Sequence, residues 1–170
     1  MNQDDLYEQA TVAHGAALDR LARAYEFDPD ARRDLLQEIH LQLWRSFAQF
    51  DGRCSTRTWV YRVAHNVATG HVVRQRRVRE RLVSVEDVEA MPNARRAEGT
   101  GDRAAALSVL SDLIGRLKPL DRQIIVCYLE DLDAHATAEI TGVSPGNVAV
   151  KIHRIKAIFK RWFDEGGPRD

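Results

Sequence analysis

Apolar side chains recur every three or four residues along most of the chain, the spacing that places them on one face of an α-helix. Strand-like alternation is weak almost everywhere, so the pattern predicts an all-α protein. It predicts seven helices, over residues 6–25, 30–48, 56–77, 103–117, 120–130, 134–141 and 145–163.

Residues between these segments are typical helix breakers and caps. Asp28-Pro29 and Ser144-Pro145 combine a capping side chain with a proline, which is favourable in the first turn of a helix. Asp51-Gly52 and Gly142 fall where an apolar stripe stops. Each stripe predicts part of a core: Leu18, Leu21, Ala22 and Tyr25; Leu35, Ile39 and Leu43; Val60, Val63, Ala64, Val67 and Ala68; Val148, Ile152, Ile155, Phe159 and Trp162.

Residues 82–102 contain proline, glycine and polar side chains without a sustained period, which is typical of a linker. We therefore predict two small helical domains joined by a flexible linker: a three-helix domain over 1–81 and a four-helix domain over 103–170. In the free protein, we expect these domains to move relative to each other.

Composition excludes several classes of protein. The apolar fraction is 44% and the charged fraction 29%, values typical of a globular domain. The longest apolar run, 124–129, is six residues, far short of the ~20 of a membrane helix, and the acidic residues 1–5 do not resemble a signal peptide. Cys54 and Cys127 have no close Cys or His spacing, so we expect a soluble cytoplasmic protein without membrane insertion or metal.

The net charge is zero, but acidic and basic residues are concentrated in four alternating segments of the chain. Residues 1–50 carry five basic and nine acidic groups, and 82–142 carry six and eleven. Residues 51–81 carry eight arginines and two acids, while 143–163 hold five basic groups and no acid. Such runs are often solvated helix faces, but two basic blocks in one small chain favour a polyanionic partner.

Signals of catalysis are missing from the sequence. No histidine stands with a serine or cysteine in a nucleophile pattern, and the ten glycines are dispersed rather than gathered in a phosphate loop. His40 and His153 have no ligand partner four residues away. We therefore expect no catalytic residues, no cofactor and no enzymatic activity.

The second half carries a helix-turn-helix signature. Ala138 and Gly142 have the spacing of a small residue at a helix contact followed by a turn glycine, and Ser144-Pro145 starts the next helix. That helix places its apolar stripe on one side and Asn147, Lys151, Arg154 and Lys156 outside the stripe, as major-groove reading requires. A helical hairpin with a charged face is the alternative.

Residues 50–62 mix arginines with aromatic side chains around a short polar loop. Aromatic rings stack on unpaired bases while arginines contact phosphates, so the mixture suits single-stranded nucleic acid. For Trp59 or Tyr61 taken alone, a place in the core is the better interpretation. Asn66 either is solvated or reads a base edge.

Both halves resemble one known family. Residues 35–39 with Leu43-Trp44, and 57–66, look like region two of bacterial RNA polymerase sigma factors. Residues 117–123 and 142–154 look like region four. Their order, joined by a short linker over about residues 15–163, resembles the extracytoplasmic-function class.

The resemblance implies three binding surfaces. Polymerase docking would use Asp34, Gln37, Glu38, Leu41 and Trp44. Recognition and melting of the minus-ten element would use Arg53, Arg57, Trp59, Arg62, Asn66, Arg74, Arg76 and Arg77. Reading of the minus-thirty-five element would use Ser144, Asn147, Val148, Lys151, Arg154 and Lys156.

The implied partners are promoter DNA and core RNA polymerase, through the clamp coiled coil of its largest subunit and its flap tip. Members of the class often have an anti-sigma protein that clamps both domains, and we expect a monomer when free. One alternative is a regulator that binds duplex DNA as a dimer through residues 134–156, without polymerase docking. Another is a pure interaction protein. The arginine and aromatic block at 53–77 favours a factor that opens DNA.

Overall fold

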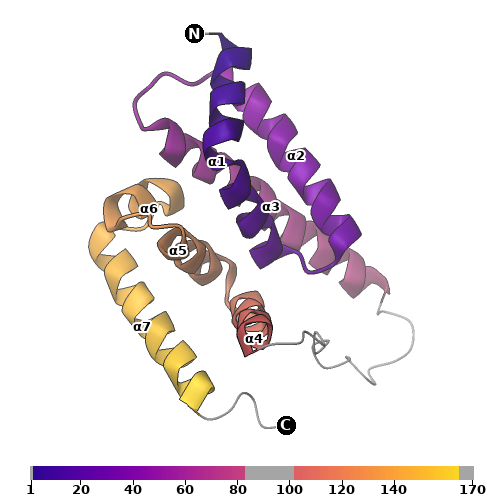
Figure 1. Cartoon of the computed structure of the whole chain (residues 1–170), viewed down its shortest axis with the longest axis vertical. Helices are drawn as coiled ribbons and strands as arrows, with labels where there is room; N and C mark the ends of the chain where they lie inside the picture. Colours follow the sequence, from indigo (N-terminus) through magenta and orange to yellow (C-terminus); the bar gives the residue numbers. More distant parts are fainter. Residues whose placement is uncertain (1, 83–101, 165–170) are drawn as a thin grey trace.

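The computed structural model describes residues 2–82 and 102–164, and these form helices and short connections only (Figure 1). The helices are α1 (Gln3–Tyr25), α2 (Pro29–Phe47), α3 (Thr56–Leu82), α4 (Asp102–Arg116), α5 (Pro119–Leu129), α6 (Ala134–Thr141) and α7 (Pro145–Asp164). The all-α prediction and its seven segments are confirmed. Residues 83–101, almost all of the predicted linker, lie outside the described residues, so its flexibility stays a prediction.

Side-chain caps explain why several helices begin where they do. Asn2 and Asp5 form a reciprocal capping box at the start of α1, which the apolar pattern alone does not reveal. Asp28 Oδ1 accepts hydrogen bonds from the backbone N–H groups of Asp30 and Ala31, at 3.1 and 2.9 Å. Asp133 caps α6 in the same way.

Helices α1, α2 and α3 form a three-helix bundle, drawn from indigo to magenta in Figure 1. The stripes predicted for α1 and α2 are buried, and Leu18, Leu21, Leu35, Ile39 and Leu43 are completely inaccessible to solvent. In α3, Val60, Ala64 and Ala68 are buried while Val63 and Val67 are half-buried. The bundle therefore presents the outer faces of α2 and α3 to solvent.

Helices α5, α6 and α7 pack against one another, and α4 packs against α5 and α1. Gly142 ends α6 with φ +74°, and its N–H donates to the Ala138 carbonyl at 2.8 Å. This left-handed conformation suits glycine, and it turns the chain sharply into α7. The predicted helix-turn-helix is thus present.

The two groups of helices pack against each other, and their relative movement in the free protein stays a prediction. Helix α3 contacts α6 and α5, and α1 contacts α4. Ile125, Cys127 and Ile140 belong to the same hydrophobic core as the first bundle. None of the described helices is apolar over a length sufficient to cross a membrane.

Candidate nucleic-acid interface

One face of α2 gathers the residues predicted to dock polymerase. Asp34, Gln37, Leu41 and Trp44 are exposed, and Glu38 is half-exposed. Their spacing of three or four residues places them side by side, opposite the buried Leu35–Ile39–Leu43 stripe. The face combines two acids with two exposed apolar side chains.

Neighbouring helices hold two residues of this face. The indole Nε1 of Trp44 donates to Asp4 Oδ1 at 2.8 Å, so the first turn of α1 fixes the ring. Arg74 Nη2 of α3 lies 2.8 Å from Glu38 Oε2. A predicted DNA residue and a predicted polymerase residue therefore form an ion pair in the isolated chain.

The loop before α3 is organised by its own side chains. Gly52 has φ +75°, and Asp51 binds Arg53 twice, at its backbone N–H (3.1 Å) and at its guanidinium (2.8 Å). Ser55 Oγ accepts the backbone N–H of Thr58 at 3.0 Å, which caps α3. The Arg53 side chain extends into solvent at this turn.

The predicted minus-ten residues of α3 do not all lie in one environment. Asn66 is exposed, whereas Arg62 is half-buried and its Nε has no hydrogen-bond partner among the described residues. Trp59 is held in the bundle: its Nε1 donates to Ser46 Oγ at 2.9 Å, and its ring meets the edge of Phe50. The structure thus favours the core interpretation of Trp59.

Arg57 faces the second group of helices. Its Nη2 donates to the backbone carbonyl of Glu130, and its guanidinium lies over the Tyr61 ring, 5.9 Å from the centroid. Arg74 and Arg76 are exposed further along α3, and the side chain of Arg77 lies outside the described part of the structure. Arg57 is therefore engaged between the domains.

Helix α7 exposes a face that differs in part from the predicted one. Ser144, Asn147 and Arg154 are exposed, as expected for residues that contact DNA. Val148 is completely buried, so the prediction that it contacts DNA is wrong: its side chain belongs to the core. Lys151 Nζ lies 2.6 Å from Asp121 Oδ1 of α5, which draws Lys151 toward the body of the domain.

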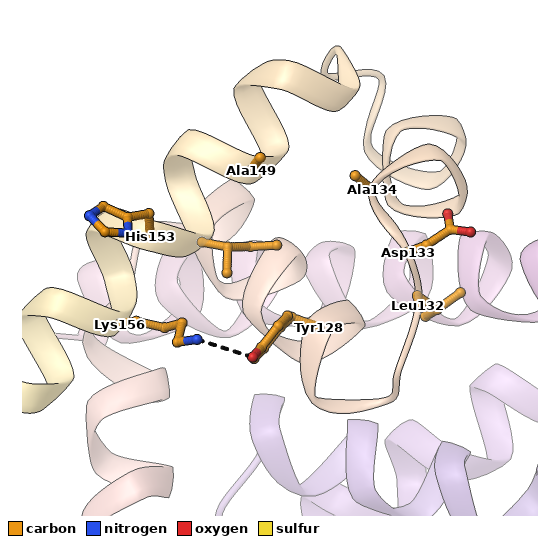
Figure 2. Close-up of a pocket in the computed structure, with 8 residues that line it drawn as sticks. Tyr128, Leu132, Asp133, Ala134, Ala149, His153 and Lys156 are labelled. Atoms are coloured by element: carbon orange, nitrogen blue, oxygen red, sulfur yellow. Dashed lines mark hydrogen bonds between the residues drawn. The ribbon is translucent and has the colours of Figure 1, made fainter.

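A groove of about 370 Å³ runs between α5, the start of α6 and α7 (Figure 2). Leu132 and Ile152 line it, with His153 along the α7 side. Lys156 reaches across it: Nζ lies 3.2 Å from the Tyr128 hydroxyl and 5.2 Å from the ring centroid. Lys156 therefore lies on the groove side of α7, on the opposite side of the helix axis from Asn147, since nine residues make two and a half turns.

Sequence reasoning missed the residues that join the domains. Glu130 Oε1 and Oε2 accept hydrogen bonds from Arg20 Nε and Nη2, each at 2.6 Å. Tyr61 also donates to Oε2, at 3.1 Å. Burial and the nearby carboxylate raise the pKa of Tyr61, which keeps its hydroxyl protonated and able to donate.

A buried histidine lies in the same contact region. His65 Nδ1 is 2.9 Å from the Tyr25 hydroxyl, and its Nε2 is 3.3 Å from Cys127 Sγ. Burial lowers the pKa of His65 to about 3 and raises that of Cys127 to about 12, so both groups are neutral near pH 7. No cluster of three or more His, Cys, Asp or Glu that could bind a metal occurs among the described residues.

Family comparison agrees with both halves of this geometry. Residues 11–78 match the family model described as Sigma-70 region 2. Residues 107–158 match the model described as Sigma-70, region 4. The first match covers the α1–α3 bundle from residue 11 onward, and the second covers most of α4 through α7.

Individual relatives extend the likeness. The sigma factor CnrH of Cupriavidus metallidurans is 26% identical over 159 residues, which cover 89% of this chain and 83% of CnrH. The ECF sigma factor SigX of Bacillus subtilis is 33% identical over 60 residues, but this match spans only 35% of this chain and 31% of SigX.

A solved structure shares the fold at low sequence identity. The sigma factor RpoE of Bartonella quintana, in complex with the anti-sigma factor NepR, is 18% identical to this chain. The TM-score is 0.71, over 93% of this chain and 96% of RpoE. With regions two and four in order on packed helical domains, the chain belongs to the extracytoplasmic-function class of RNA polymerase sigma factors.

Proposed function

We propose that the exposed face of α2 docks core RNA polymerase, that α3 and its preceding loop bind and open the minus-ten element, and that α7 reads the minus-thirty-five element. The observation that carries this division is the separation of an acidic and apolar face on α2 from an arginine-rich surface on α3 of the same bundle. A sigma factor confers promoter specificity on polymerase and is not itself a catalyst.

Docking is supported by the composition of the α2 face. Leu41 and Trp44 are exposed apolar side chains, and Asp34 and Glu38 flank them. Exposed apolar side chains with charges around them are typical of a protein interface. Asp4 adds a further contribution, because its hydrogen bond to Trp44 orders the indole before the partner arrives.

Promoter opening is supported by unused polar groups along α3. Arg62 Nε is a buried donor without a partner in the described residues, and such a donor costs about 1–3 kcal/mol unless an acceptor is supplied. A promoter phosphate or base would supply one. Asn66 lies one turn further along the helix and is exposed, where it can contact a base edge.

We further propose that the packed arrangement of the two domains must open before Arg57 can contact DNA. In the isolated chain, the guanidinium of Arg57 is occupied by the backbone carbonyl of Glu130. The end of α5 also lies against the first half of α3. Promoter binding by Arg57 therefore competes with contact between the domains.

An anti-sigma protein is the proposed regulator. The solved relative RpoE is in complex with the anti-sigma factor NepR, and its overall fold resembles that of this chain. A partner that stabilises the packed arrangement would lower the fraction of chains able to bind both promoter elements, by mass action on the closed form.

Two single substitutions test the division between docking and opening. Leu41→Glu places a charge on the exposed α2 face and should reduce co-elution with core polymerase at least tenfold. Asn66→Ala should leave co-elution unchanged while lowering permanganate reactivity of promoter thymines. Val12→Glu is the matched control for Leu41→Glu, because Val12 of α1 is 89% exposed and lies outside all three proposed surfaces.

The proposal would be wrong if Leu41→Glu and Asn66→Ala lost both activities in parallel while remaining folded. Normal co-elution of the Leu41→Glu variant would exclude the α2 face as the docking site. The wild-type chain could also bind promoter duplex but never co-elute with core polymerase. That result would replace the proposed function with that of a regulator acting without polymerase. Glu38 is avoided as a test position, because its ion pair with Arg74 connects both surfaces.

A further inference from the structure

Val150 is an exposed apolar residue on the helix proposed to read DNA. It is 57% exposed, whereas the other large apolar side chains described in α7 are buried or half-buried: Val148, Ile152, Ile155, Ile158 and Phe159. A β-branched residue gains nothing in helix propensity over alanine. The fold therefore gives no reason for valine at this position.

Isolated exposed apolar residues are common on proteins, so the position of Val150 decides its interpretation. Val150 is three residues after Asn147 and four before Arg154, so the three side chains share one face of α7. Gly146, four residues before Val150, is exposed beside it and has no side chain, which lets the helix backbone approach a partner closely.

Resting on the proposed function of α7, we propose that Val150 contacts the 5-methyl group of a thymine in the minus-thirty-five element. That methyl group is the one apolar feature that a base pair presents in the major groove, and small apolar side chains recognise it. Val150 is thus a specificity residue that adds to the polar contacts of Asn147 and Arg154.

Helix geometry limits where this thymine lies. At 1.5 Å per residue, Val150 is about 4.5 Å along the axis from Asn147 and about 6 Å from Arg154. Base pairs are spaced about 3.4 Å apart, so each interval corresponds to one or two base pairs. Asparagine pairs best with adenine and arginine with guanine. The thymine should therefore lie within about two base pairs of an adenine contact on one side and a guanine contact on the other.

Lys151 is four residues after Asn147 and three before Arg154, so it lies at the other edge of the same face, but its charge is engaged. Its Nζ is paired with Asp121 at 2.6 Å, and its side chain is one-third exposed. One residue along a helix rotates the side chain by about 100°, so Val150 and Lys151 lie at opposite edges of the row formed by Asn147 and Arg154. The ion pair holds the charged candidate of this face toward α5, whereas the exposed side chain of Val150 is open to a partner.

Deoxyuridine tests the methyl contact directly, because it differs from thymidine only by that methyl group. Polymerase reconstituted with the full chain is used to select upstream elements from a randomised duplex library. Each thymine of the selected element is then replaced by deoxyuridine. One replacement should weaken binding about fourfold, the factor that corresponds to ~0.8 kcal/mol for one buried methyl-sized group.

Variants assign the contact to Val150. Val150→Ala should bind the thymine and deoxyuridine duplexes equally, with the affinity that the wild-type chain has for deoxyuridine. Folding is not at risk, because the side chain is exposed and alanine is the stronger helix former. Val12→Ala, at an exposed valine on α1, should keep the wild-type discrimination.

The inference is overturned if every deoxyuridine replacement is silent for the wild-type chain, if the sensitive thymine lies more than two base pairs from the Asn147 and Arg154 contacts, or if Val150→Ala still discriminates. Arg154→Ala separates this failure from failure of the proposed function. When Arg154→Ala weakens upstream binding and deoxyuridine does not, only the role of Val150 is wrong. When neither Arg154→Ala nor deoxyuridine weakens upstream binding, α7 is not the upstream reader and both proposals are wrong.

Discussion

Arg20 and Glu130, 110 residues apart in the sequence, form a two-point ion pair with both N···O distances at 2.6 Å. The Glu130 side chain is only 9% exposed, while that of Arg20 is 59% exposed. Glu130 also accepts the Tyr61 hydroxyl and, at its carbonyl, the Arg57 guanidinium. One residue of the second domain thus binds both α1 and α3 of the first.

Glu130→Gln should weaken the packing of the two domains by about 1–2 kcal/mol, since the pair is half-open to solvent and its strength is reduced accordingly. The expected result is faster amide hydrogen exchange in α6 and in the first half of α3, together with a larger radius of gyration. Arg33→Gln is the control, because Arg33 pairs with Asp30 on the surface of α2. Unchanged exchange in the Glu130 variant would show that the apolar contacts alone hold the domains together.

Stability should fall as the pH is lowered through the range in which His65 would titrate if exposed. The pKa of His65 is about 3 in the folded chain and 6.5 in the unfolded chain, so the unfolded state binds more protons between these values. Lowering the pH from 7 to 5 should therefore cost about 2 kcal/mol through this group alone. Urea unfolding at each pH measures the free energy of unfolding and so tests this loss.

His65→Gln isolates the contribution of this histidine, because glutamine is polar and does not titrate. The variant should lose stability less steeply between pH 7 and 5 than the wild-type chain, whatever its stability at pH 7. His153→Gln, on the exposed side of α7, should keep the wild-type slope. Equal slopes for the His65 variant and the wild-type chain would mean that other groups cause the pH dependence.

Arg122→Ala should destabilise the chain by about 2–3 kcal/mol, because a buried guanidinium that binds carbonyl oxygens is lost. Arg122 Nε donates to the Ile114 carbonyl at 3.1 Å, and Nη2 donates to that of Gly115, so Arg122 caps the end of α4. The guanidinium also lies 5.5 Å from the centre of the Tyr25 ring.

Two further variants show what causes the loss of stability in Arg122→Ala. Arg122→Met keeps the apolar stem but not the hydrogen bonds, so it should recover part of the stability if packing matters. Lys118→Ala, at an exposed position just before α5, should change the free energy of unfolding by less than about 0.5 kcal/mol. An Arg122→Ala loss no larger than that of Lys118→Ala would exclude the cap.

A matched pair of glycines should respond in opposite directions to alanine. Gly142 has φ +74°, where an L side chain is strained, so Gly142→Ala should cost about 1–2 kcal/mol. Gly146 lies in α7 with open space around it, so Gly146→Ala should stabilise by about 0.5 kcal/mol. Thermal unfolding of both variants tests the turn, and an unchanged or raised Tm for Gly142→Ala would contradict the left-handed cap.

Much of the fold could be predicted from the sequence because helices are encoded by interactions among near neighbours. The stripe through Leu35, Ile39 and Leu43 predicted a buried face, and all three are fully buried. Pro29 and Pro145 marked helix starts, and Gly142 marked a helix end, through the fixed backbone preferences of proline and glycine. Each signal lies within a few residues of the feature that it predicts.

For the candidate site, residue type and helix period predicted only which side chains share an exposed face. The face of α2 emerged as expected, since exposure there is simply the complement of the buried stripe. On α7 the same reasoning was wrong for Val148 as a DNA contact, because its side chain is completely buried. Lys151 is drawn to Asp121, and Val150 is exposed, because the packing of α5 against α7 decides which side of the helix is covered.

The contact between the domains depended on tertiary structure alone. Nothing near Glu130 in the sequence indicates that it binds Arg20, and His65 gives no local sign that it will lie against Cys127. Such pairs form when two finished surfaces match in shape and charge, and burial then strengthens their hydrogen bonds. The sequence by itself determined the helices, their buried stripes and the turn at Gly142, since those arise within about four residues. Only the tertiary structure decided that Arg57 is held by Glu130, because that contact joins a side chain to a backbone carbonyl 73 residues away in the sequence.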